Sequence, residues 1–553
     1  MLPIRRCVLL PLLITSLLIL SLNSIIPLGA EITRSKESHF VIEEPYDQTQ
    51  RAITDSMIWN FSTYLGGSGE DFGRDVAVDS SGNIIIVGGI GSANFPLLNA
   101  YQSAYGGGES DVFIAKFSSD GQSLLFFTFL GGDGTEWGVD VEVDSANNIW
   151  ITGLTSSSDF PIVNAYQTVH SGGEDVFIAK FSSDGQSLLF SSYLGGSSDD
   201  RGWRLAIDSS DNMIVAGYSR SNDFPTVNAT QETFGGAVDF ILFKFSSDGQ
   251  SLLFSTYHGG SNSDWAHGIA LDAEENIIVI GTLSVVSSGD LQAHIAKFSS
   301  EGQLLFSKSF GGISSDYGHG VAVDSVGNII VTGTTASASF PTVNASQEEF
   351  GGREDTFVTK LTPDGNYLFS TYLGGSGTDG GYFVTIDSVD NIFITGNTVS
   401  SNFPILNAIQ ETNSGDVDAY ITYLDPNGQL LFSTYIGGRD FDGGGTIAFD
   451  ATGVILVGDT TSNDFPLVNA YQDCPGGNHD LFLCKFVFST GSPITPSTCT
   501  QPFTSSFPST SISSSSTGTS NVSSTSGFVF LVVVTGLISI VGIFPFRRKK
   551  CPK

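Results

Sequence analysis

The sequence predicts an all-β fold: a seven-bladed β-propeller of four-stranded blades, closed by an N-terminal strand and followed by a C-terminal transmembrane helix. A Gly-Gly pair recurs seven times, with spacings of 65, 64, 64, 52, 63 and 63 residues between first glycines. An aspartate stands thirteen residues after each first glycine. A repeat of this length that carries four strand-like segments is typical of propeller blades. The first glycines are Gly66, Gly131, Gly195, Gly259, Gly311, Gly374 and Gly437. The aspartates are Asp79, Asp144, Asp208, Asp272, Asp324, Asp387 and Asp450.

The composition agrees with this fold class. Charged residues make up only 14% of the chain, and Gly 65 and Phe 42 favour many short strands and turns. An all-helical or a disordered chain is therefore not expected.

The N-terminal residues predict a secretory signal. Arg5 and Arg6 precede an apolar run over residues 8–22, and small residues end the segment at Gly29 and Ala30. We expect cleavage near Ala30, so that residues 1–30 are the signal peptide and 31–56 are an N-terminal extension. An uncleaved anchor is the alternative interpretation.

Each repeat between residues 57 and 491 reads as four strands. In the second repeat these are VDVEVD, NIWITG, DVFIAKF and LLFSSYLGG, which are rich in the β-branched and aromatic residues that strands favour. Turns such as Asp79–Asn83 and the Asp120-Gly121 pair separate them. The seventh repeat offers only three strands, and residues 59–65 are an unpaired fourth strand. Pairing them closes the ring and removes an exposed sheet edge.

The C-terminal residues predict a membrane anchor. Residues 492–526 are mostly Ser, Thr and Pro and read as an extended stalk. Residues 527–546 are uncharged and long enough to cross a bilayer as a helix, and the basic tail 547–553 should stay cytoplasmic. We therefore expect a single-pass cell-surface protein with an extracytoplasmic propeller. A sorting signal whose apolar span is removed is the alternative.

The repeats resemble a known family. The motifs DSSGNIIIVGG, DFPTVNATQ and DVFIAKFSSDGQSLLFSSYLGG are similar to those of the seven-bladed β-propeller repeat family (SBBP), and the resemblance covers residues 57–491. The resemblance implies a surface or secreted propeller and does not imply a single activity.

Charge excludes one class of partner. The formal net charge is -34, and all 57 acidic residues lie between residues 31 and 490. Such a surface repels phosphate backbones, so nucleic acid is excluded as a partner.

Cysteines and sequons fit an exported chain. Cys474, Cys484 and Cys499 fall in the expected oxidising compartment, where one disulfide is expected, but the sequence does not say which two residues pair. The candidate glycosylation sites are Asn60, Asn228, Asn344 and Asn521.

An acidic residue stands five positions after each first glycine, where the fourth strand of one blade crosses to the first strand of the next. We call the face that carries these crossings the top face. The favoured interpretation is that each carboxylate accepts N–H groups of its own glycine-rich turn. Calcium is the alternative, although no cluster supplies several ligands from one loop. The residues are Asp71, Glu136, Asp200, Asp264, Asp316, Asp379 and Asp442.

The loop between the second and third strands carries a Phe-Pro motif in six repeats. We expect the phenylalanines to fill space between adjacent blades rather than to stack on a ligand. The fourth repeat lacks this loop, which predicts a notch over blade four. The phenylalanines are Phe95, Phe160, Phe224, Phe340, Phe403 and Phe465.

One position differs from repeat to repeat, which favours recognition over a structural role. Eight residues after the first glycine the chain has Arg74, Val139, Trp203, His267, His319, Tyr382 and Gly445. Large polar and aromatic side chains anchor ligands and interfaces. We expect a binding pocket near the channel mouth on the top face, and its candidate ligand-binding residues are Arg74, Trp203, His267, His319 and Tyr382.

These observations favour a non-catalytic module that binds an extracellular protein or glycan. No GxSxG, HExxH or phosphate-cradling loop is present, so no catalytic residue and no cofactor is assigned, with calcium the one candidate ion. Two alternatives are open: a glycan-processing enzyme that uses a top-face histidine and carboxylates, and a purely structural surface-coat component. The sequence does not indicate the oligomeric state.

Overall fold

A computed structural model describes residues 56–284, 290–489 and 494–499. The expected signal peptide, most of the stalk, the transmembrane segment, the basic tail and Asn521 lie outside the described residues. Within the described ranges, no helix is long and apolar enough to span a bilayer.

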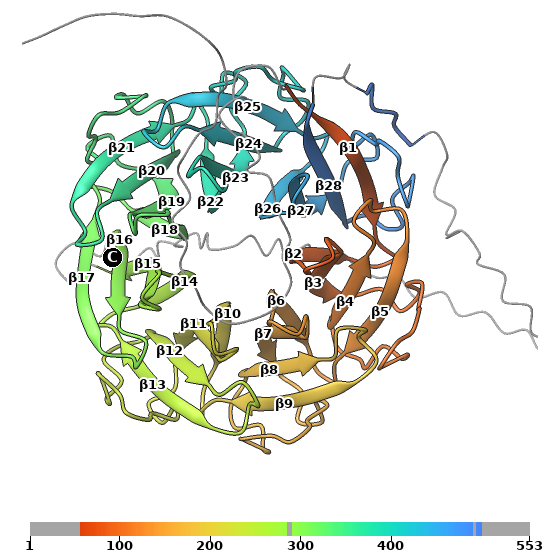
Figure 1. Cartoon of the computed structure of the whole chain (residues 1–553), viewed down its shortest axis with the longest axis vertical. Helices are drawn as coiled ribbons and strands as arrows, with labels where there is room; N and C mark the ends of the chain where they lie inside the picture. Colours follow the sequence, from red (N-terminus) through yellow and green to blue (C-terminus); the bar gives the residue numbers. More distant parts are fainter. Residues whose placement is uncertain (1–55, 285–289, 490–493, 500–553) are drawn as a thin grey trace, which may run out of the picture.

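The described chain forms seven four-stranded antiparallel sheets around a central channel (Figure 1). Blade one contains β2 (Asp71–Val78), β3 (Ile84–Ile90), β4 (Asp111–Phe117) and β5 (Leu124–Leu130). Blade two contains β6 (Glu136–Val143), β7 (Ile149–Thr155), β8 (Asp175–Phe181) and β9 (Leu188–Leu194). Blade three contains β10 (Asp200–Ile207), β11 (Met213–Ser219), β12 (Asp239–Phe245) and β13 (Leu252–His258).

The remaining blades follow the same order. Blade four contains β14 (Asp264–Leu271), β15 (Ile277–Ser284), β16 (Leu291–Phe298) and β17 (Leu304–Phe310). Blade five contains β18 (Asp316–Val323), β19 (Ile329–Thr335), β20 (Asp355–Leu361) and β21 (Tyr367–Leu373). Blade six contains β22 (Asp379–Ile386), β23 (Ile392–Thr398), β24 (Asp418–Leu424) and β25 (Leu430–Ile436). Blade seven contains β26 (Asp442–Phe449), β27 (Gly453–Thr460), β28 (Asp480–Ser489) and β1 (Ser56–Leu65).

The core consists of apolar layers between neighbouring blades. Strands such as β3 and β4 are buried along their whole length, because both faces of each sheet pack against another blade. One buried cluster joins Phe61 and Leu483 of blade seven to Ile86 and Phe113 of blade one. Each blade is therefore stabilised mainly by its two neighbours.

The first strand of the chain closes the ring, as the sequence predicts. β1 pairs antiparallel with β28, from Ser56 opposite Ser489 to Leu65 opposite Leu481. The pairing joins the two ends of the repeat array within blade seven. All seven sheets therefore have the same four-stranded form.

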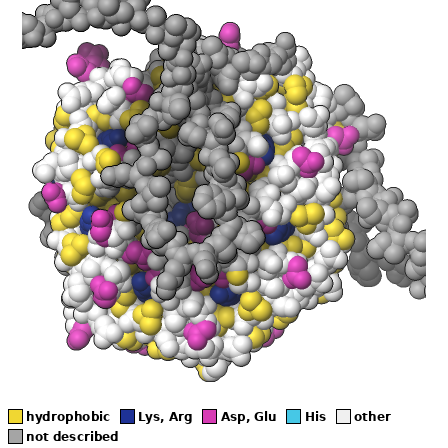
Figure 2. Space-filling view, viewed as in Figure 1, with side chains coloured by type: hydrophobic (Ala, Val, Ile, Leu, Met, Phe, Trp, Pro, Cys, Tyr) yellow, Lys and Arg dark blue, Asp and Glu magenta, His cyan; other side chains and the backbone are white. Residues whose placement is uncertain are grey.

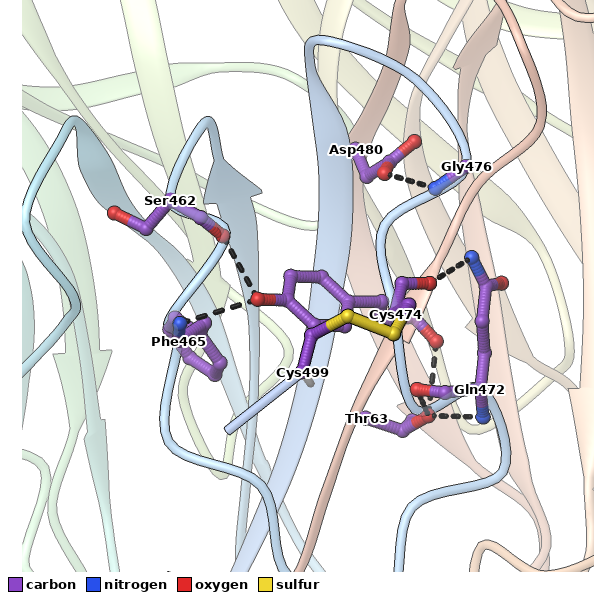
Figure 3. The surroundings of a disulfide bond; sticks show 9 residues. Thr63, Ser462, Phe465, Gln472, Cys474, Gly476, Asp480 and Cys499 are labelled. Carbon is purple, nitrogen blue, oxygen red and sulfur yellow. Dashed lines mark hydrogen bonds between the residues drawn. A yellow bond between two sulfur atoms is a disulfide. The ribbon is translucent and has the colours of Figure 1, made fainter. Parts of the chain in front are cut away.

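A disulfide fixes the chain where it leaves the propeller. Cys474, in the loop before β28, is bonded to Cys499, and their Cα atoms lie 5.0 Å apart (Figure 3). Beside it, the Gln472 N–H donates to Thr63 Oγ1 of β1 at 2.8 Å. The remaining candidate, Cys484, is a buried free thiol in β28. The disulfide thus lies next to the strand pair that closes the ring.

The aspartate thirteen residues after each first glycine has a structural role on the face opposite the top face. Asp79 accepts backbone N–H groups from Ser81 and Asn83, and it forms an ion pair of 2.8 Å with Lys116 of β4. Lys116 Nζ also donates to the Ser183 carbonyl in the next blade, at 2.9 Å. The same aspartate–lysine pair occurs in six blades. Figure 2 shows basic side chains spaced around the centre of one face, with acidic side chains near several of them.

Closure of the ring generates a testable prediction. Tyr64 of β1 is fully buried, and its hydroxyl donates to the Ser462 carbonyl at 2.8 Å and accepts from the Phe465 N–H at 3.1 Å. Tyr64→Phe should lower the free energy of unfolding by about 1–3 kcal/mol, because it leaves buried groups without partners. Denaturant titration measures the loss. Tyr101→Phe, at an exposed tyrosine, is the control and should change little. Equal stability of both variants would contradict a packed β1.

Candidate functional site

A β-bulge interrupts the innermost strand of every blade, at the position that varies between repeats. In six blades one residue is inserted into the pairing with the second strand, for example between Gly73 and Asp75 and between Ala266 and Gly268. In β26 Gly445 and Thr446 together lie opposite Val457, which is also one extra residue. Because a bulge re-aims the side chain at that point, a ring of inserted residues lines the channel. The ring is Arg74, Val139, Trp203, His267, His319, Tyr382 and Gly445.

Four of these side chains form a continuous aromatic wall. The ring centres of Trp203 and His267 are 6.1 Å apart, those of His267 and His319 are 5.3 Å apart, and those of His319 and Tyr382 are 5.4 Å apart. All four are partly exposed to the channel. The sequence therefore identifies residues that lie next to one another although they belong to four different blades.

The wall is uncharged at neutral pH. Burial lowers the pKa of His267 to about 4 and lowers the pKa of His319, and the neighbouring Arg204 adds to the effect at both. His267 Nδ1 lies 3.0 Å from the Gly318 carbonyl, so Nδ1–H is the donor and Nε2 keeps its lone pair. The wall thus combines apolar rings with an imidazole acceptor.

Charged side chains from the innermost strands of blades one to three lie beside the wall, and sequence reasoning missed most of them. Arg204 Nη1 lies 3.4 Å from Asp140 Oδ1, and the guanidinium of Arg74 lies 4.8 Å from the ring centre of Trp137. Burial raises the pKa of Asp140 and lowers that of Arg74. Arg204 and Asp140 follow the bulge residues directly, at a position that is glycine in blades four and five. That difference between repeats was the signal that could have found them.

The structure places the candidate residues deeper than the sequence suggests. The acidic residue five positions after the first glycine begins each innermost strand, whereas the bulge lies in the middle of that strand. A cavity of about 460 Å³ lies at the opposite end of the channel from the top face, where Glu142, Leu205 and Ile269 line it. The candidate residues therefore lie inside the channel, at the middle of the innermost strands, and not at the top-face rim.

The seven acidic residues at the blade crossings bind their own turns. Each accepts the N–H of the second glycine of its Gly-Gly pair, over distances of 2.6–3.0 Å. All seven are buried. This geometry supports the structural interpretation. Among the residues that the structure describes, no group of three or more His, Cys, Asp or Glu side chains could hold a metal ion.

A second buried aspartate faces this carboxylate in six blade junctions. It begins the third strand of the preceding blade and accepts an N–H from the loop before it; Asp480, for example, accepts the Gly476 N–H at 2.7 Å (Figure 3). A Cβ added to Gly437 would lie 2.7 Å from Asp418 Oδ1 and 2.9 Å from Asp442 Oδ2, which explains why only glycine fits between two carboxylates. The second aspartates are Asp111, Asp175, Asp239, Asp355, Asp418 and Asp480.

The six phenylalanines of the Phe-Pro loops are buried, as expected of space-filling residues. Each packs on its own blade; the rings of Phe95 and Phe127, for example, are 4.3 Å apart. In the same loops, the sequon residues Asn228 and Asn344 donate through Nδ2 to the Leu253 and Leu368 carbonyls. These two amides therefore have a structural role in the loop. Asn60 lies in β1 and is partly exposed.

The carboxyl pairs generate a prediction about pH. Burial raises the pKa of Asp480 to about 7, and the charge of Asp71 adds to the effect. A carboxyl with a raised pKa stabilises the fold when it is protonated, so its contribution is full below about pH 4 and is lost as the pH rises through about 7. Asp480→Asn does not titrate, so its melting temperature relative to the native protein should rise between pH 5 and pH 8. Thermal unfolding at both pH values measures this, with the exposed Glu109→Gln as the control. A difference that is independent of pH would contradict the pairing.

Comparisons with known proteins agree with the repeat architecture. The profile of the SBBP beta-propeller repeat matches residues 60–96, 306–341 and 368–404. The uncharacterized WD repeat-containing protein L264 of Acanthamoeba polyphaga mimivirus is 22% identical over 452 residues, which are 64% of this chain and 32% of that protein. The chain thus spans about a third of the length of this curated relative.

Solved propeller structures are more distant. YCF48 bound to a D1 peptide is 9% identical with a TM-score of 0.39, and the match covers 77% of this chain and 94% of that one. The quinohemoprotein alcohol dehydrogenase of Comamonas testosteroni is 8% identical with a TM-score of 0.42, over 82% and 79% of the two chains. At this level of similarity neither structure indicates a function. The repeat matches and the ring of seven four-stranded sheets together show that this chain is a seven-bladed β-propeller that carries SBBP beta-propeller repeats.

Proposed function

We propose that the propeller is a non-catalytic recognition module, presented at the cell surface, that binds an extracellular protein or glycan in its central channel. One observation carries the proposal. The side chains that enter the channel at the bulges differ from blade to blade, yet four of them join into one aromatic wall. A purely structural position would keep similar residues in every blade, as the crossing carboxylates do.

The chemistry of the channel suits a ligand with both a flat apolar face and polar groups. Trp203 and Tyr382 offer ring surfaces for stacking, and His267 Nε2 offers a hydrogen-bond acceptor. Arg204, which follows Trp203 in β10 and lies 5.8 Å from the ring centre of Phe383, adds a permanent positive charge beside the wall. Sugar rings and aromatic peptide side chains both present such a combination of surfaces.

The surroundings of the histidines favour binding over catalysis. Among the described residues, neither His267 nor His319 has a hydrogen bond to a carboxylate that would orient it as a general base. Burial also lowers both pKa values far from neutrality. A paired acid and base, which glycan processing requires, is therefore not assembled at the wall.

The proposed location rests on the sequence. The signal-like segment 1–30, the Ser/Thr-rich stretch 492–526 and the apolar segment 527–546 support export, a stalk and a membrane anchor.

The proposal predicts the effect of removing the wall. The full chain should be screened against carbohydrate and extracellular-protein libraries, with and without calcium. For the ligand found, the triple change of His267, His319 and Tyr382 to Ala should weaken binding at least ~10-fold, because it removes three adjacent contact rings. His170→Ala, in a loop of blade two, is the matched control and should bind normally.

Equal binding by the folded triple variant would contradict the channel site. Consumption of a polysaccharide with release of product would support the enzymatic alternative. Binding that the triple variant loses, without product, supports the recognition module.

A further inference from the structure

In six blades a segment of the loop between the second and third strands pairs with the outward-facing edge of the outermost strand. Val163 N–H donates to the Ser191 carbonyl at 3.1 Å, and Ser191 N–H donates back to the Val163 carbonyl at 2.8 Å. Asn164 Nδ2 donates to the Leu189 carbonyl at 3.1 Å. A short bridge of this kind covers the sheet edge in every blade except blade four. The paired residues are Leu98 with Phe127, Val163 with Ser191, Val227 with Ser255, Val343 with Ser370, Leu406 with Ser433 and Val468 with Ser62.

Blade four lacks the segment that would cover its edge. Only residues 285–290 connect β15 to β16, whereas nineteen residues, 336–354, connect the same strands in blade five. The outermost strand β17 lies at the rim of the ring (Figure 1). Its Ser307 occupies the register position of Ser191, since Ser307 lies opposite Ala296 as Ser191 lies opposite Ala179. Among the described residues, none pairs with the outward N–H or carbonyl of Ser307.

The strand edge of blade four is exposed. Leu305 is 53% exposed, and Ser307 and Ser309 are exposed as well, whereas the equivalent residues Ser191 and Tyr193 of β9 are buried. An uncovered edge presents unpaired backbone donors and acceptors and is a template for another strand. This edge therefore has the geometry to accept an additional extended segment.

β17 has the residue types that form hydrogen bonds with the loop segment in other blades. The Ser hydroxyl of this register position donates to the carbonyl of the loop proline, as Ser370 Oγ does to Pro341 at 2.6 Å. Ser255 and Ser62 do the same to Pro225 and Pro466. Ser307 is the same residue type, and Leu305 has the carbonyl that would accept an asparagine amide. The groups that bind a Pro-x-Val-Asn segment are thus present in blade four.

β17 and its neighbour β16 have lost the residues that hold the loop phenylalanine. In blade two, Phe160 packs on Phe177 and Tyr193, with ring centres 4.9 and 6.2 Å apart. His294 and Ser309 stand at the equivalent register positions in blade four. The site left by the absent loop is therefore polar and does not fit an aromatic side chain.

A groove adjoins the same edge. It has a volume of about 770 Å³ and lies between the Thr230–Thr233 loop of blade three and Leu304 and Ser307 of β17. Its histidines, His258 and His294, have their Nε2 atoms 3.2 Å apart, and burial lowers their pKa values to about 4 and about 3. The two Nε2 atoms bind each other and His294 Nδ1 lies 2.9 Å from Ser309 Oγ, so the imidazoles make this end of the groove polar and uncharged.

We propose that the free edge of β17 binds an extended segment of a partner protein, with a Pro-x-Val-Asn or Pro-x-Leu-Asn pattern, that adds a strand to blade four. The occupant follows from the six edges that are covered within the chain. In all six the pattern is bound through the Val or Leu backbone and the asparagine amide, and in three of them also through the proline carbonyl. Strand addition is an established mode of peptide recognition. The site uses none of the channel residues and is independent of the proposed function.

The test supplies the missing segment in trans. The probe is a peptide of the blade-five loop, residues 341–347 (Pro-Thr-Val-Asn-Ala-Ser-Gln), added to the full chain at several millimolar. We expect saturable binding with a Kd on the order of 1 mM, since four hydrogen bonds carry it. Hydrogen exchange should slow at the amides of Ser307 and Ser309. A peptide with Asp in place of its Asn lacks the amide donor and should bind several-fold more weakly.

Three variants of the chain complete the test. Replacing residues 285–290 with residues 336–354, with the change Phe340→Ser to suit the polar site, should cover the edge and abolish binding, and the triple alanine variant of the channel should bind the peptide normally. Ser307→Pro removes the backbone donor and should also abolish protection. Absence of saturable binding to the native chain, or binding that survives the loop graft, would overturn the proposal. Self-association of the native chain that the graft abolishes would assign the edge to a second copy instead and would likewise overturn it.

Discussion

The pairing of β1 with β28 is the interaction on which the rest of the structure depends. A blade buries its two faces only against its neighbours, so an open row of blades would leave two apolar faces and a strand edge exposed. Donation of β1 to blade seven closes the ring and completes the last sheet. Only in a closed ring do all seven innermost strands lie around one central axis. Trp203, His267, His319 and Tyr382, which are up to 179 positions apart in the numbering, become neighbours for this reason.

Much of the fold could be predicted from the sequence, because each repeat has the same pattern of strand-forming and turn-forming residues. Seven copies in register identify the blades, and the orphan strand at residues 59–65 identifies how they close. The depth of the candidate site could not be predicted. It depends on the bulge, which is a property of strand register, and alternation of apolar residues does not reveal one inserted residue. The disulfide partner of Cys474 could not be predicted either, since it depends on where the chain runs after β28.

Repetition and deviation have different meanings in this chain. Residues repeated in every blade have structural roles: Asp71 and its equivalents bind the crossing turns, and Asp79 and its equivalents hold the hairpin turns. The lysine of the third strand follows the same rule. It recurs in six blades of the sequence, and in the structure it forms an ion pair with the aspartate. Deviations gather in two places, at the bulges inside the channel and at the uncovered edge of blade four. These are the surfaces where the requirements of the fold leave side chains free to differ.

Native-state hydrogen exchange of β1 tests the closed ring most directly. If β1 is an integral strand of blade seven, the amides of Thr63 and Leu65, which face β28, should exchange only through global unfolding, with the same free energy as the central amides of β28. Exchange of these β1 amides at a much lower free energy, while β28 stays protected, would show that β1 opens on its own. That result would contradict the closure from which the channel and its aromatic wall follow.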